Sequence, residues 1–387
     1  MKWEKLKIKD FASVVTGGTP STSVSEYWDN GNIPWLNSGE LNQGLVTSCS
    51  NYITNAGLKN SSTKMMPADT VLIALTGATT GVTGYLTFEA SANQSVTGIL
   101  PSQKHEPRYL YYYLSSIRPK ILNDAYGGAQ KHISQQYVKE IEVLLPPLNV
   151  QKKIADTLDK ADALRKKDQQ LLRKYEELEK ALYFQFINSV ESKEVSLIEL
   201  AEGKDGIKCG PFGTQLLATE FQSKGIFLWG IKHVNKHFSF NTTEFVSEEK
   251  AKELESYNIK SGDLVMTRKG TIGNVCIYPN HLAPGIMHSD LLRLRVDSNL
   301  VNNIFMQYQF RFDNKIKEEI TKISHGAIMA GINVSKLKKL KVRVPSMKLQ
   351  NEFSKKISRI FDMKKSLSVS DEKGGELFQS LISKFLS

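Results

Sequence analysis

The sequence predicts a mixed α/β protein in which two tandem globular domains alternate with two long helices. Three observations predict this architecture. The chain of 387 residues is long enough for two domains, each with its own core. The stretch "LPPLNVQKKI" at 145–154 has an echo, "VPSMKLQNEF", at 344–353. After each stretch, a highly charged segment carries apolar residues at heptad spacing, which is typical of a long packed helix.

The echo extends upstream at one constant offset. In both copies a short helical turn is followed by an alternating strand, a proline and a helix. The match includes a proline and a glutamine, so duplication explains it better than chance. The matched pairs are Ile133 and Ile332, Val138 and Leu337, Ile141 and Leu340, Val143 and Val342, Leu145 and Val344, Pro146 and Pro345, Leu148 and Met347, and Gln151 and Gln350.

The repeat divides the chain into four segments. We predict a first globular domain over 1–147, a central helix over 148–190, a second globular domain over 191–345 and a C-terminal helix over 346–387. The two globular segments should resemble each other in fold, because weaker echoes such as "ADTVLIALTGATTG" and "GDLVMTRKGTIG" lie inside them. The helices should therefore separate two related domains arranged with pseudo-twofold symmetry.

The two helices carry heptad columns that predict an antiparallel pair. Asp168 interrupts one column and Lys364 interrupts the other, so we expect these two side chains to neutralise each other. The alternative is that both helices simply face solvent. The residues expected in the seam are Ile154, Ala161, Leu164, Asp168, Leu171, Tyr175, Leu178 and Leu182 in the first helix, and Phe353, Ile357, Ile360, Lys364 and Leu367 in the second.

Composition narrows the location and the class of partner. No apolar run is long enough to span a membrane, and the start "MKWEKLKIKD" lacks the apolar core of a signal peptide, so we expect a cytoplasmic protein without a membrane partner. The three cysteines lie far apart and form no CxxC pair, which favours neither a disulfide framework nor a cysteine zinc site. A net charge of +11 favours a polyanionic partner.

Motifs for catalysis are missing from the sequence. The Gly-rich stretch "LTGATTGVTGY" lacks the GK[ST] ending of a phosphate-binding loop and is better explained as a turn between strands. His233 and His237 have the spacing of half a metal site, but no cysteine pair or acidic residue lies at a suitable spacing. No GxSxG elbow occurs. We therefore predict no catalytic residue, no metal site and no cofactor-binding site in this chain.

Polar loops are the remaining candidates for function. Asn, Gln, Arg, Lys, Ser and Thr can read base edges, and amides of Gly-rich turns suit phosphates. Arg293 and Arg295 share a strand face that is explained nearly as well by solvation as by phosphate contact, and each loop could be an ordinary solvated turn. The predicted DNA-contacting residues are Asn37, Ser38, Thr76, Thr79, Gln130, Lys131 and His132 in the first domain, and Lys208, Lys232, His233, Arg268, Lys269, Thr271 and His325 in the second.

Three stretches resemble the specificity (S) subunits of type I restriction–modification systems. They are "VVTGGTPSTSVSEYWDNGNIPWLNSGEL" at 14–41, "IKCGPFGTQL" at 207–216 and "GGAQKHISQQYVKEIEVLLPPLNVQKKIADTLDKAD" at 127–162. The resemblance covers essentially the whole chain, and its domain order matches the repeat. The chain departs from the family's Pro-Pro-Leu-x-Glu-Gln at Val150, and it has Ser346 and Met347 in place of Pro-Leu in the second copy.

The resemblance implies a non-catalytic subunit that binds double-stranded DNA. Each domain would read one half of a bipartite target, and the helices would set the spacer between the halves. Two modification (methyltransferase) subunits would bring S-adenosylmethionine, and two restriction subunits would bring ATP and Mg for translocation and cleavage. Two other hypotheses stay open at this point: a self-contained DNA-modifying enzyme with unfamiliar motifs, and a coiled-coil scaffold that binds proteins.

Overall fold

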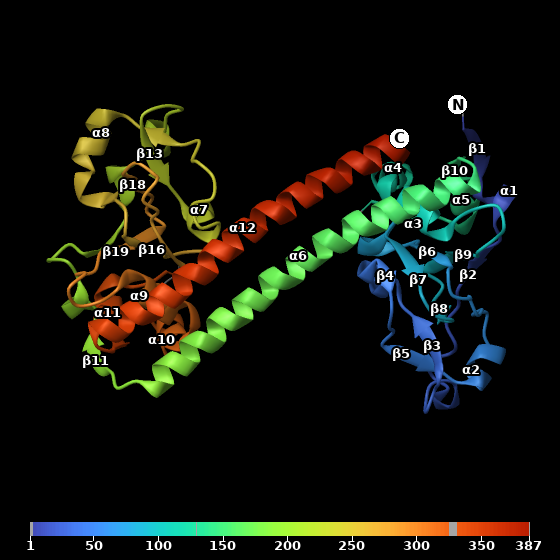
Figure 1. Ribbon diagram of the computed structural model, residues 1–387, viewed down its shortest axis with the longest axis horizontal. Coiled ribbons are helices and arrows are strands. Elements are labelled where there is room, and N and C mark those ends of the chain that lie inside the picture. The colour runs from blue at the N-terminus through green and yellow to red at the C-terminus, as the bar shows by residue number, and fades with distance from the viewer. Residues whose placement is uncertain (1–2, 129, 325–330, 387) are drawn as a thin grey trace. The chain divides into compact units, whose positions relative to one another are not determined.

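The computed structural model describes residues 3–128, 130–324 and 331–386 (Figure 1). The chain divides into two compact units. Unit 1 comprises Met1–Gln169 and Val369–Ser387, and unit 2 comprises Gln170–Ser368. The division passes through both long helices, so each unit holds one globular α/β domain together with part of each helix. We name the globular parts the first domain and the second domain.

The first domain is built on two sheets and a two-stranded ribbon (Figure 1). The ribbon pairs β1 (Glu4–Lys7) with β10 (Glu142–Leu145). The larger sheet has the order β2 (Val14–Thr16), β9 (Val96–Ile99), β6 (Val71–Ala74), β7 (Thr83–Leu86), β4 (Leu45–Val46), and the smaller has the order β5 (Asn51–Ile53), β3 (Ile33–Leu36), β8 (Ser91–Ala92). Its helices are α1 (Ile8–Phe11), η1 (Ser25–Tyr27), η2 (Ser38–Gln43), α2 (Asn55–Lys59), η3 (Gly77–Thr79), α3 (Pro107–Ser116), α4 (Arg118–Asp124) and α5 (Gln135–Glu140), where η denotes a 3₁₀ helix.

The second domain repeats this plan. Its ribbon pairs β11 (Lys193–Ser196) with β20 (Lys341–Val344). The sheets have the orders β12 (Ile207–Cys209), β19 (Leu291–Leu294), β16 (Leu264–Thr267), β17 (Val275–Ile277) and β14 (Phe245–Val246), β13 (Ile226–Trp229), β18 (Gly285–Met287), β15 (Asn258–Ile259). Its helices are η4 (Leu197–Leu200), η5 (Gly213–Gln215), η6 (Ala218–Glu220), α7 (Ile231–Asn235), α8 (Glu248–Glu253), η7 (Glu255–Tyr257), α9 (Asn303–Phe312), α10 (Asn314–Ser324) and α11 (Val334–Lys338).

The directions in which the strands pair show that the two domains share the same strand topology. Strands β6 and β16 each lie between two antiparallel neighbours, and β3 and β13 each have a parallel partner, β8 and β18 respectively. One difference stands out. In the first domain β4 pairs in parallel with β7, whereas no strand of the described chain pairs with the outer side of β17.

The repeated glutamines make the same contacts in the two units. Gln151 Oε1 accepts a hydrogen bond from Glu106 N at 2.8 Å, and its Nε2 donates to Pro146 O at 2.8 Å. Gln350 does the same with Asn302 N and Pro345 O, at 2.8 Å each. Both side chains are buried, so each satisfies backbone groups that would otherwise be left without partners. This explains why proline and glutamine recur together.

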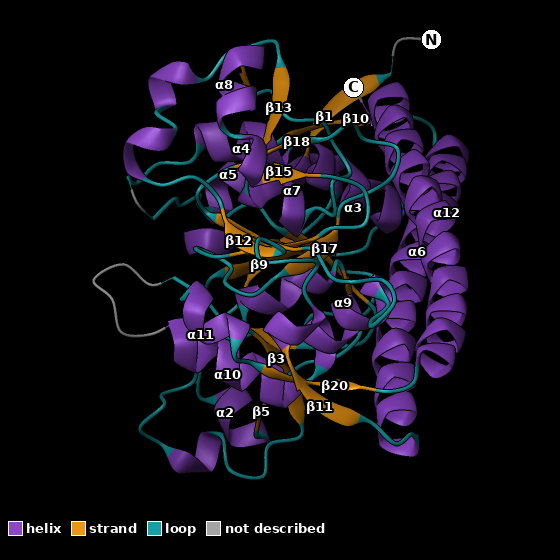
Figure 2. Cartoon of the chain, turned by 90° about the vertical axis from the view of Figure 1, so that its left-hand side faces the viewer, coloured by secondary structure: helices purple, strands orange, loops and turns teal. Residues whose placement is uncertain are grey.

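The long helices are α6 (Leu148–Ser189) and α12 (Met347–Leu386), which lie side by side (Figure 1 and Figure 2). The colours of Figure 1 show that they run antiparallel within each unit. In unit 2 the rings of Phe186 and Phe353 stack with centroids 4.8 Å apart, and Glu179 binds Lys364 nearer the middle of the helices. In unit 1 the Arg165 guanidinium lies over the Phe378 ring. The alternative that both helices face only solvent is therefore wrong.

On α6, the prediction that the heptad column of Leu164, Leu171 and Leu178 lies in the seam between the helices is wrong. Leu164 is 64% exposed and Leu178 is 43% exposed, while Leu171 is only partly buried. Residues three and four positions apart share a helix face, and apolarity alone favoured the column that contains these leucines. The inward column lies one residue later. It contains the buried Leu158 and two charged residues that have partners, Arg165 and Glu179.

The expected pairing of Asp168 with Lys364 is also corrected. Asp168 accepts a hydrogen bond from Ser370 Oγ at 2.8 Å within unit 1, and Lys364 binds Glu179 at 3.0 Å within unit 2. The remaining seam residues are buried or partly buried: Ile154, Ala161, Tyr175, Leu182, Phe353, Ile357, Ile360 and Leu367.

Candidate nucleic-acid interface

In the first domain, three loops far apart in the sequence come together. Asn37 precedes η2, Thr79 ends η3 between β6 and β7, and His132 follows α4. Thr79 Oγ1 donates to Ser38 Oγ at 3.1 Å, and Thr76 forms an isolated antiparallel bridge with His132. The structure therefore brings six of the seven predicted residues into one group, which we name the first-domain cluster: Asn37, Ser38, Thr76, Thr79, Lys131 and His132.

The loop that supplies His132 is fixed at its base. Tyr126 N donates to His132 O at 3.1 Å, and His132 N donates to Tyr126 O at 2.8 Å. Their rings meet edge to face at 4.9 Å, which leaves Tyr126 60% exposed. The Lys131 carbonyl accepts from Gly77 N at 3.0 Å, which ties the loop to η3. Gln130 is exposed on the same loop. The loop thus presents an aromatic ring and an amide beside the hydroxyls of the cluster.

An amide pair adjoins the first-domain cluster. Asn93 Nδ2 donates to Asn37 Oδ1 at 3.2 Å, and Asn93 Oδ1 accepts from Ser95 N at 3.0 Å. Asn93 follows β8, the parallel neighbour of β3, so the topology of the smaller sheet places the two amides together. Nothing in the sequence marks Asn93, because a single asparagine after a short strand carries no distinguishing pattern.

In the second domain, the turn after β16 gathers three of the predicted residues. The Arg268 guanidinium lies 4.5 Å from the centroid of the Phe212 ring, and its Nε donates to Ile332 O at 3.1 Å. Lys269 Nζ lies 2.9 Å from Asp290 Oδ1. Thr271 Oγ1 donates to Asn235 Oδ1 at 2.9 Å. Basic, hydroxyl and amide groups therefore meet at this turn, as they do in the first-domain cluster.

The other predicted residues of the second domain lie elsewhere. Lys208 is paired with Asp205 and lies over the Tyr257 ring, at 4.8 Å from its centroid. Lys232 is exposed on α7, with its Nζ 3.7 Å from Glu244 Oε1. His325 lies outside the described residues.

The prediction that His233 contacts DNA is wrong. Its side chain is fully buried, lies edge to face against Trp229 at 5.0 Å and accepts a hydrogen bond from Gly230 N through Nδ1 at 3.1 Å. Burial lowers the pKa of His233, so the ring stays neutral. The sequence favoured exposure because the flanking residues are polar, but α7 directs this position into the apolar interior.

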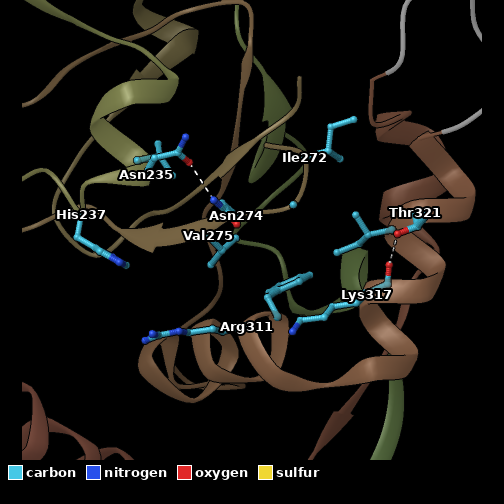
Figure 3. A pocket seen from close by; sticks show the side chains of 12 residues that line it. Asn235, His237, Ile272, Asn274, Val275, Arg311, Lys317 and Thr321 are labelled. Atoms are coloured by element: carbon cyan, nitrogen blue, oxygen red, sulfur yellow. Dashed lines mark hydrogen bonds between the residues drawn. The ribbon is translucent and has the colours of Figure 1, made fainter. Parts of the chain in front are cut away.

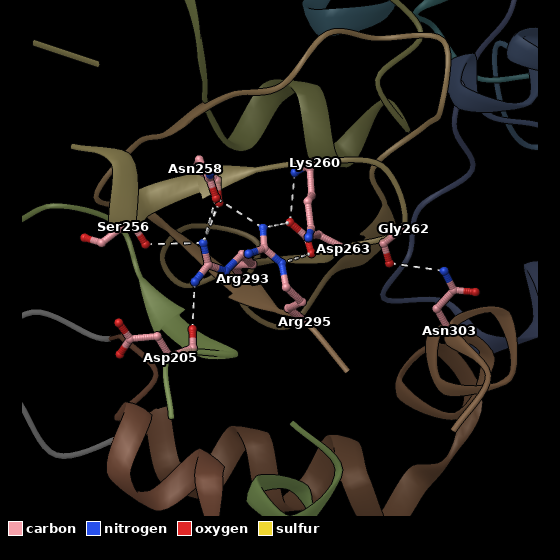
Figure 4. Close-up of polar contacts among 9 residues, drawn as sticks. All are labelled: Asp205, Ser256, Asn258, Lys260, Gly262, Asp263, Arg293, Arg295 and Asn303. Atoms are coloured by element: carbon pink, nitrogen blue, oxygen red, sulfur yellow. Dashed lines mark hydrogen bonds and ion pairs between the residues drawn. The ribbon is translucent and has the colours of Figure 1, made fainter. Parts of the chain in front are cut away.

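Arg293 is buried and Arg295 is partly buried, and both side chains bind groups of the second domain (Figure 4). Arg293 is 3% exposed and donates to the carbonyl oxygens of Asp205 and Asn258 at 2.7 and 2.6 Å. Arg295 binds both carboxylate oxygens of Asp263, at 2.7 and 2.8 Å. Burial lowers the pKa of Arg293, and the Asp263 hydrogen bonds raise that of Arg295. Both guanidinium groups therefore serve contacts within the second domain itself.

A cavity of about 380 Å³ opens between α7 and the start of β17 on one side and α9 and α10 on the other (Figure 3). Asn235 and Asn274 lie on one wall, and Lys317 lies across from them. No pattern in the sequence marks these three residues, because the cavity joins segments that are far apart in the chain. The lining residues are Val234, Asn235, His237, Ile272, Gly273, Asn274, Val275, Phe310, Arg311, Lys317, Ile320 and Thr321.

Metal and membrane features are missing from the part of the chain that the structure describes. Within it, no three His, Cys, Asp or Glu side chains are grouped so as to hold a metal ion. No helix among the described residues is both long and apolar enough to cross a membrane.

A family model and the similar known proteins all point to the same family. The model of the type I restriction modification DNA specificity domain matches residues 1–174 and 215–368. The MjaIX specificity subunit of Methanocaldococcus jannaschii is 25% identical over 394 residues, covering 93% of this chain and 87% of that protein. The EcoR124I/EcoR124II specificity subunit of Escherichia coli is 31% identical over 153 residues, and this alignment spans 38% of each chain.

Solved structures have the same fold. The S subunit of a type I restriction–modification system from M. genitalium matches with a TM-score of 0.67 at 17% identity, over 100% of this chain and 96% of that one. A chain from structural work on complex assembly and conformational transition of the type I R-M system matches with a TM-score of 0.53 at 12% identity, over 100% and 97%. At these identities, the two likenesses establish the architecture of two domains linked by long helices.

Proposed function

The chain belongs to the type I restriction modification DNA specificity family, and from this premise we propose that its two domains each read one half of a bipartite DNA duplex target. The observation that supports this proposal best is the repeated topology with different side chains in corresponding loops. The turn between β6 and β7 carries Thr76 and Thr79, whereas the turn between β16 and β17 carries Arg268 and Lys269. Different groups at equivalent positions should recognise different base sequences.

The side chains of these loops have the chemistry that base-edge reading requires. Amides and hydroxyls present donors and acceptors to the major groove, and exposed lysines contact phosphates. The first-domain cluster includes Asn37, Ser38 and Thr79, and the exposed amide of Gln130 lies on the loop beside it. The net charge of +11 favours association with the polyanion through sequence-independent contacts.

We propose that α6 and α12 set the length of the unspecified spacer between the two half-targets. A continuous helix of 42 residues is about 63 Å long at about 1.5 Å per residue. Half-sites read in the major groove lie about 34 Å apart for each helical turn that separates them. A helix of this length therefore suits readers placed one turn or more apart.

The outward faces of the long helices are the surface that we propose for two modification (methyltransferase) subunits. In unit 1, Leu164 and Leu377 are exposed apolar side chains on α6 and α12, and in unit 2 Leu178 and Phe361 are. Large apolar groups on the exposed side of charged helices favour a protein partner. Because each unit presents such a set, one methyltransferase subunit per unit is the arrangement that we propose.

The partners would supply the chemistry. We propose that the methyltransferase subunits hold S-adenosylmethionine, that two restriction subunits hold ATP and Mg, and that this chain by itself catalyses no reaction. The proposed location is the cytoplasm, where such an assembly meets its DNA. A self-contained modifying enzyme and a protein-binding scaffold are not supported, because the relatives reported above are specificity subunits.

The test is to express the full chain with methyltransferase subunits of the same operon and to map methylated positions by single-molecule sequencing of the host DNA. We expect two unlike constant half-sites separated by a spacer of fixed length, with binding that weakens as salt rises. Methylation by the chain alone with S-adenosylmethionine would instead show an enzyme. A complex without sequence preference and without salt dependence would favour the scaffold hypothesis.

A further inference from the structure

The second domain has an amide pair at the wall of the cavity described above. Asn274 Nδ2 donates to Asn235 Oδ1 at 3.0 Å (Figure 3), and Thr271 Oγ1 donates to the same oxygen at 2.9 Å. Asn235 ends α7 and Asn274 directly precedes β17, so two ordered elements hold the amides in place. The pair is preorganised, because two donors fix the plane of the Asn235 amide.

The contacts within the pair leave one donor and one acceptor available. Asn235 Nδ2 and Asn274 Oδ1 have no hydrogen-bond partner among the described residues, and Asn235 is partly exposed and Asn274 exposed. If both amide groups were flipped, Asn235 would donate to Asn274, and the available atoms would be Asn235 Oδ1 and Asn274 Nδ2. Either orientation presents one donor beside one acceptor.

A donor beside an acceptor selects one base in the major groove. Adenine offers the N7 acceptor next to the N6 donor, and an asparagine or glutamine amide binds both. Guanine offers two acceptors, so the amide acceptor would face O6 without a proton between them. Cytosine offers only the N4 donor, and thymine only the O4 acceptor beside its methyl group. The Asn235–Asn274 pair therefore matches adenine best.

Lys317 supplies the positive charge of this cavity. Arg311, another basic residue of the lining, forms ion pairs with Glu179 at 3.2 Å and with Glu176 at 3.7 Å. Desolvation and the nearby Arg311 and Lys364 cations lower the pKa of His237, which disfavours the charged form of its ring. Lys317 is exposed on α10 and makes no ion pair within the described chain, so its ammonium group is available for a phosphate.

The first domain is built differently at the corresponding place. There β4 covers the outer side of β7, with Leu45 opposite Tyr85 and Val46 opposite Leu86. In the described second domain the equivalent strand β17 has no such neighbour, and the residues at its start line the cavity. The two domains therefore differ in what borders this edge strand.

We propose that this cavity is an adenine-reading subsite of the second domain, in which the Asn235–Asn274 pair binds the major-groove edge of an adenine and Lys317 binds a phosphate of the same DNA. This inference deepens the proposed function and rests on it. It assigns Asn235 and Asn274 as specificity-determining residues and Lys317 as a contact that carries no sequence information.

The test uses the full chain together with its methyltransferase subunits and a set of duplexes. The set is derived from the target found for the wild-type complex, with each position of both half-sites replaced in turn by the other three bases. Competition binding measures the base preference at every position. Asn274→Asp replaces the amide by a carboxylate that only accepts, so at one position the preference should move from adenine towards cytosine, by at least about five-fold.

Further variants separate base reading from other roles. Asn274→Ala should relax the preference at the same position and leave every other position unchanged. Lys317→Ala should weaken binding by one factor for all duplexes and lower the salt slope by about one. Asn241→Ala, an exposed amide outside the cavity, and Lys315→Ala, an exposed lysine of α10 outside the lining, are matched controls that should change neither quantity.

The outcomes that overturn the proposal are specific. If Asn274→Asp and Asn274→Ala leave all base preferences unchanged, or lower binding equally for all bases, the pair does not read adenine. If Lys315→Ala and Lys317→Ala act alike, the cavity holds no phosphate. A wild-type complex that prefers no base at any position overturns the proposed function itself, which is a different result from a sequence-specific complex that is indifferent to Asn274.

Discussion

Lys364 and Glu179 join α12 to α6 in unit 2, with Lys364 Nζ 3.0 Å from Glu179 Oε2 and with the Glu179 side chain only 1% exposed. The carboxylate also accepts a hydrogen bond from the Tyr308 hydroxyl at 2.7 Å and binds Arg311 at 3.2 Å. A buried carboxylate is stable only when its oxygens are paired, and here three side chains on two elements, α9 and α12, supply the partners. Glu179 is therefore central to holding the second domain on both long helices.

Replacing Glu179 by Ala should lower the free energy of unfolding by about 2–5 kcal/mol. The change leaves the buried Tyr308 hydroxyl without its acceptor and Lys364 without its counter-ion. Urea unfolding followed by the fluorescence of buried Trp229 measures the effect in this domain. Glu177→Ala, an exposed site on the same helix, should change the free energy by less than about 0.5 kcal/mol. Equal effects of the two variants would contradict the assignment.

Gln151→Ala and Gln350→Ala should each destabilise their own unit by about 1–3 kcal/mol, since each leaves a backbone N–H without its acceptor. Because Gln151 and Gln350 make the same contacts in their units, the two losses of stability should be similar in size. Gln185→Ala, at an exposed position of α6, is the matched control and should have little effect. Thermal unfolding of the three variants gives the comparison. A large loss for one glutamine and none for the other would show that the junctions are not equivalent.

Acid should weaken unit 1 through His105. Burial lowers the pKa of His105 from 6.5 to about 4, and the side chain is 2% exposed. Between these pH values the unfolded chain binds a proton that the folded chain does not, so the free energy of unfolding falls as pH falls. The loss should approach about 3 kcal/mol near pH 4 and then stop growing, because below that the folded state is protonated as well.

The measurement compares the unfolding of wild type and His105→Gln between pH 7 and pH 4. Glutamine has no titrating group and can still bind the Ser102 hydroxyl, which lies 2.9 Å from His105 Nδ1. The wild-type profile should fall more steeply than that of the variant across the window. Parallel profiles would show that His105 does not titrate differently in the folded and unfolded states.

Leu164→Asp and Phe361→Asp should each release one methyltransferase subunit from the complex. Leu164 is 64% exposed in unit 1 and Phe361 is 58% exposed in unit 2, so neither change should lower the free energy of unfolding by more than about 0.5 kcal/mol. Native mass spectrometry would count the bound subunits, and Lys160→Ala, at an exposed position of α6, is the control. If both variants kept two subunits, the proposed docking surface would be wrong.

The architecture was predictable because its signals are local. A proline that stops a strand, a glutamine that caps the junction and heptad apolar spacing all lie within short stretches, and Pro146, Gln151, Pro345 and Gln350 have the same surroundings in the two units. The second column of α6 was not predictable in this way. The inward positions Arg165 and Glu179 are charged, and their partners lie on segments that are distant in the sequence.

The candidate interface was predictable only in part. Polar turns pointed to Ser38, Thr79 and Arg268, which the fold gathers at loops. The same polar turns also predicted His233 as a DNA contact, but the structure buries this side chain. Asn235 and Asn274 become a pair only after α7 and β17 have packed together, so no spacing in the sequence marks them.

The most direct test of two readers on a helical spacer lengthens both helices. One heptad would be inserted into α6 after Gln169 and another into α12 after Ser368, where the chain passes from one unit to the other. Seven residues add about 10 Å of helix, which is about three base pairs of DNA. Methylome sequencing should then show a target with a longer spacer and two unchanged half-sites. Altered half-sites with an unchanged spacer would contradict the account.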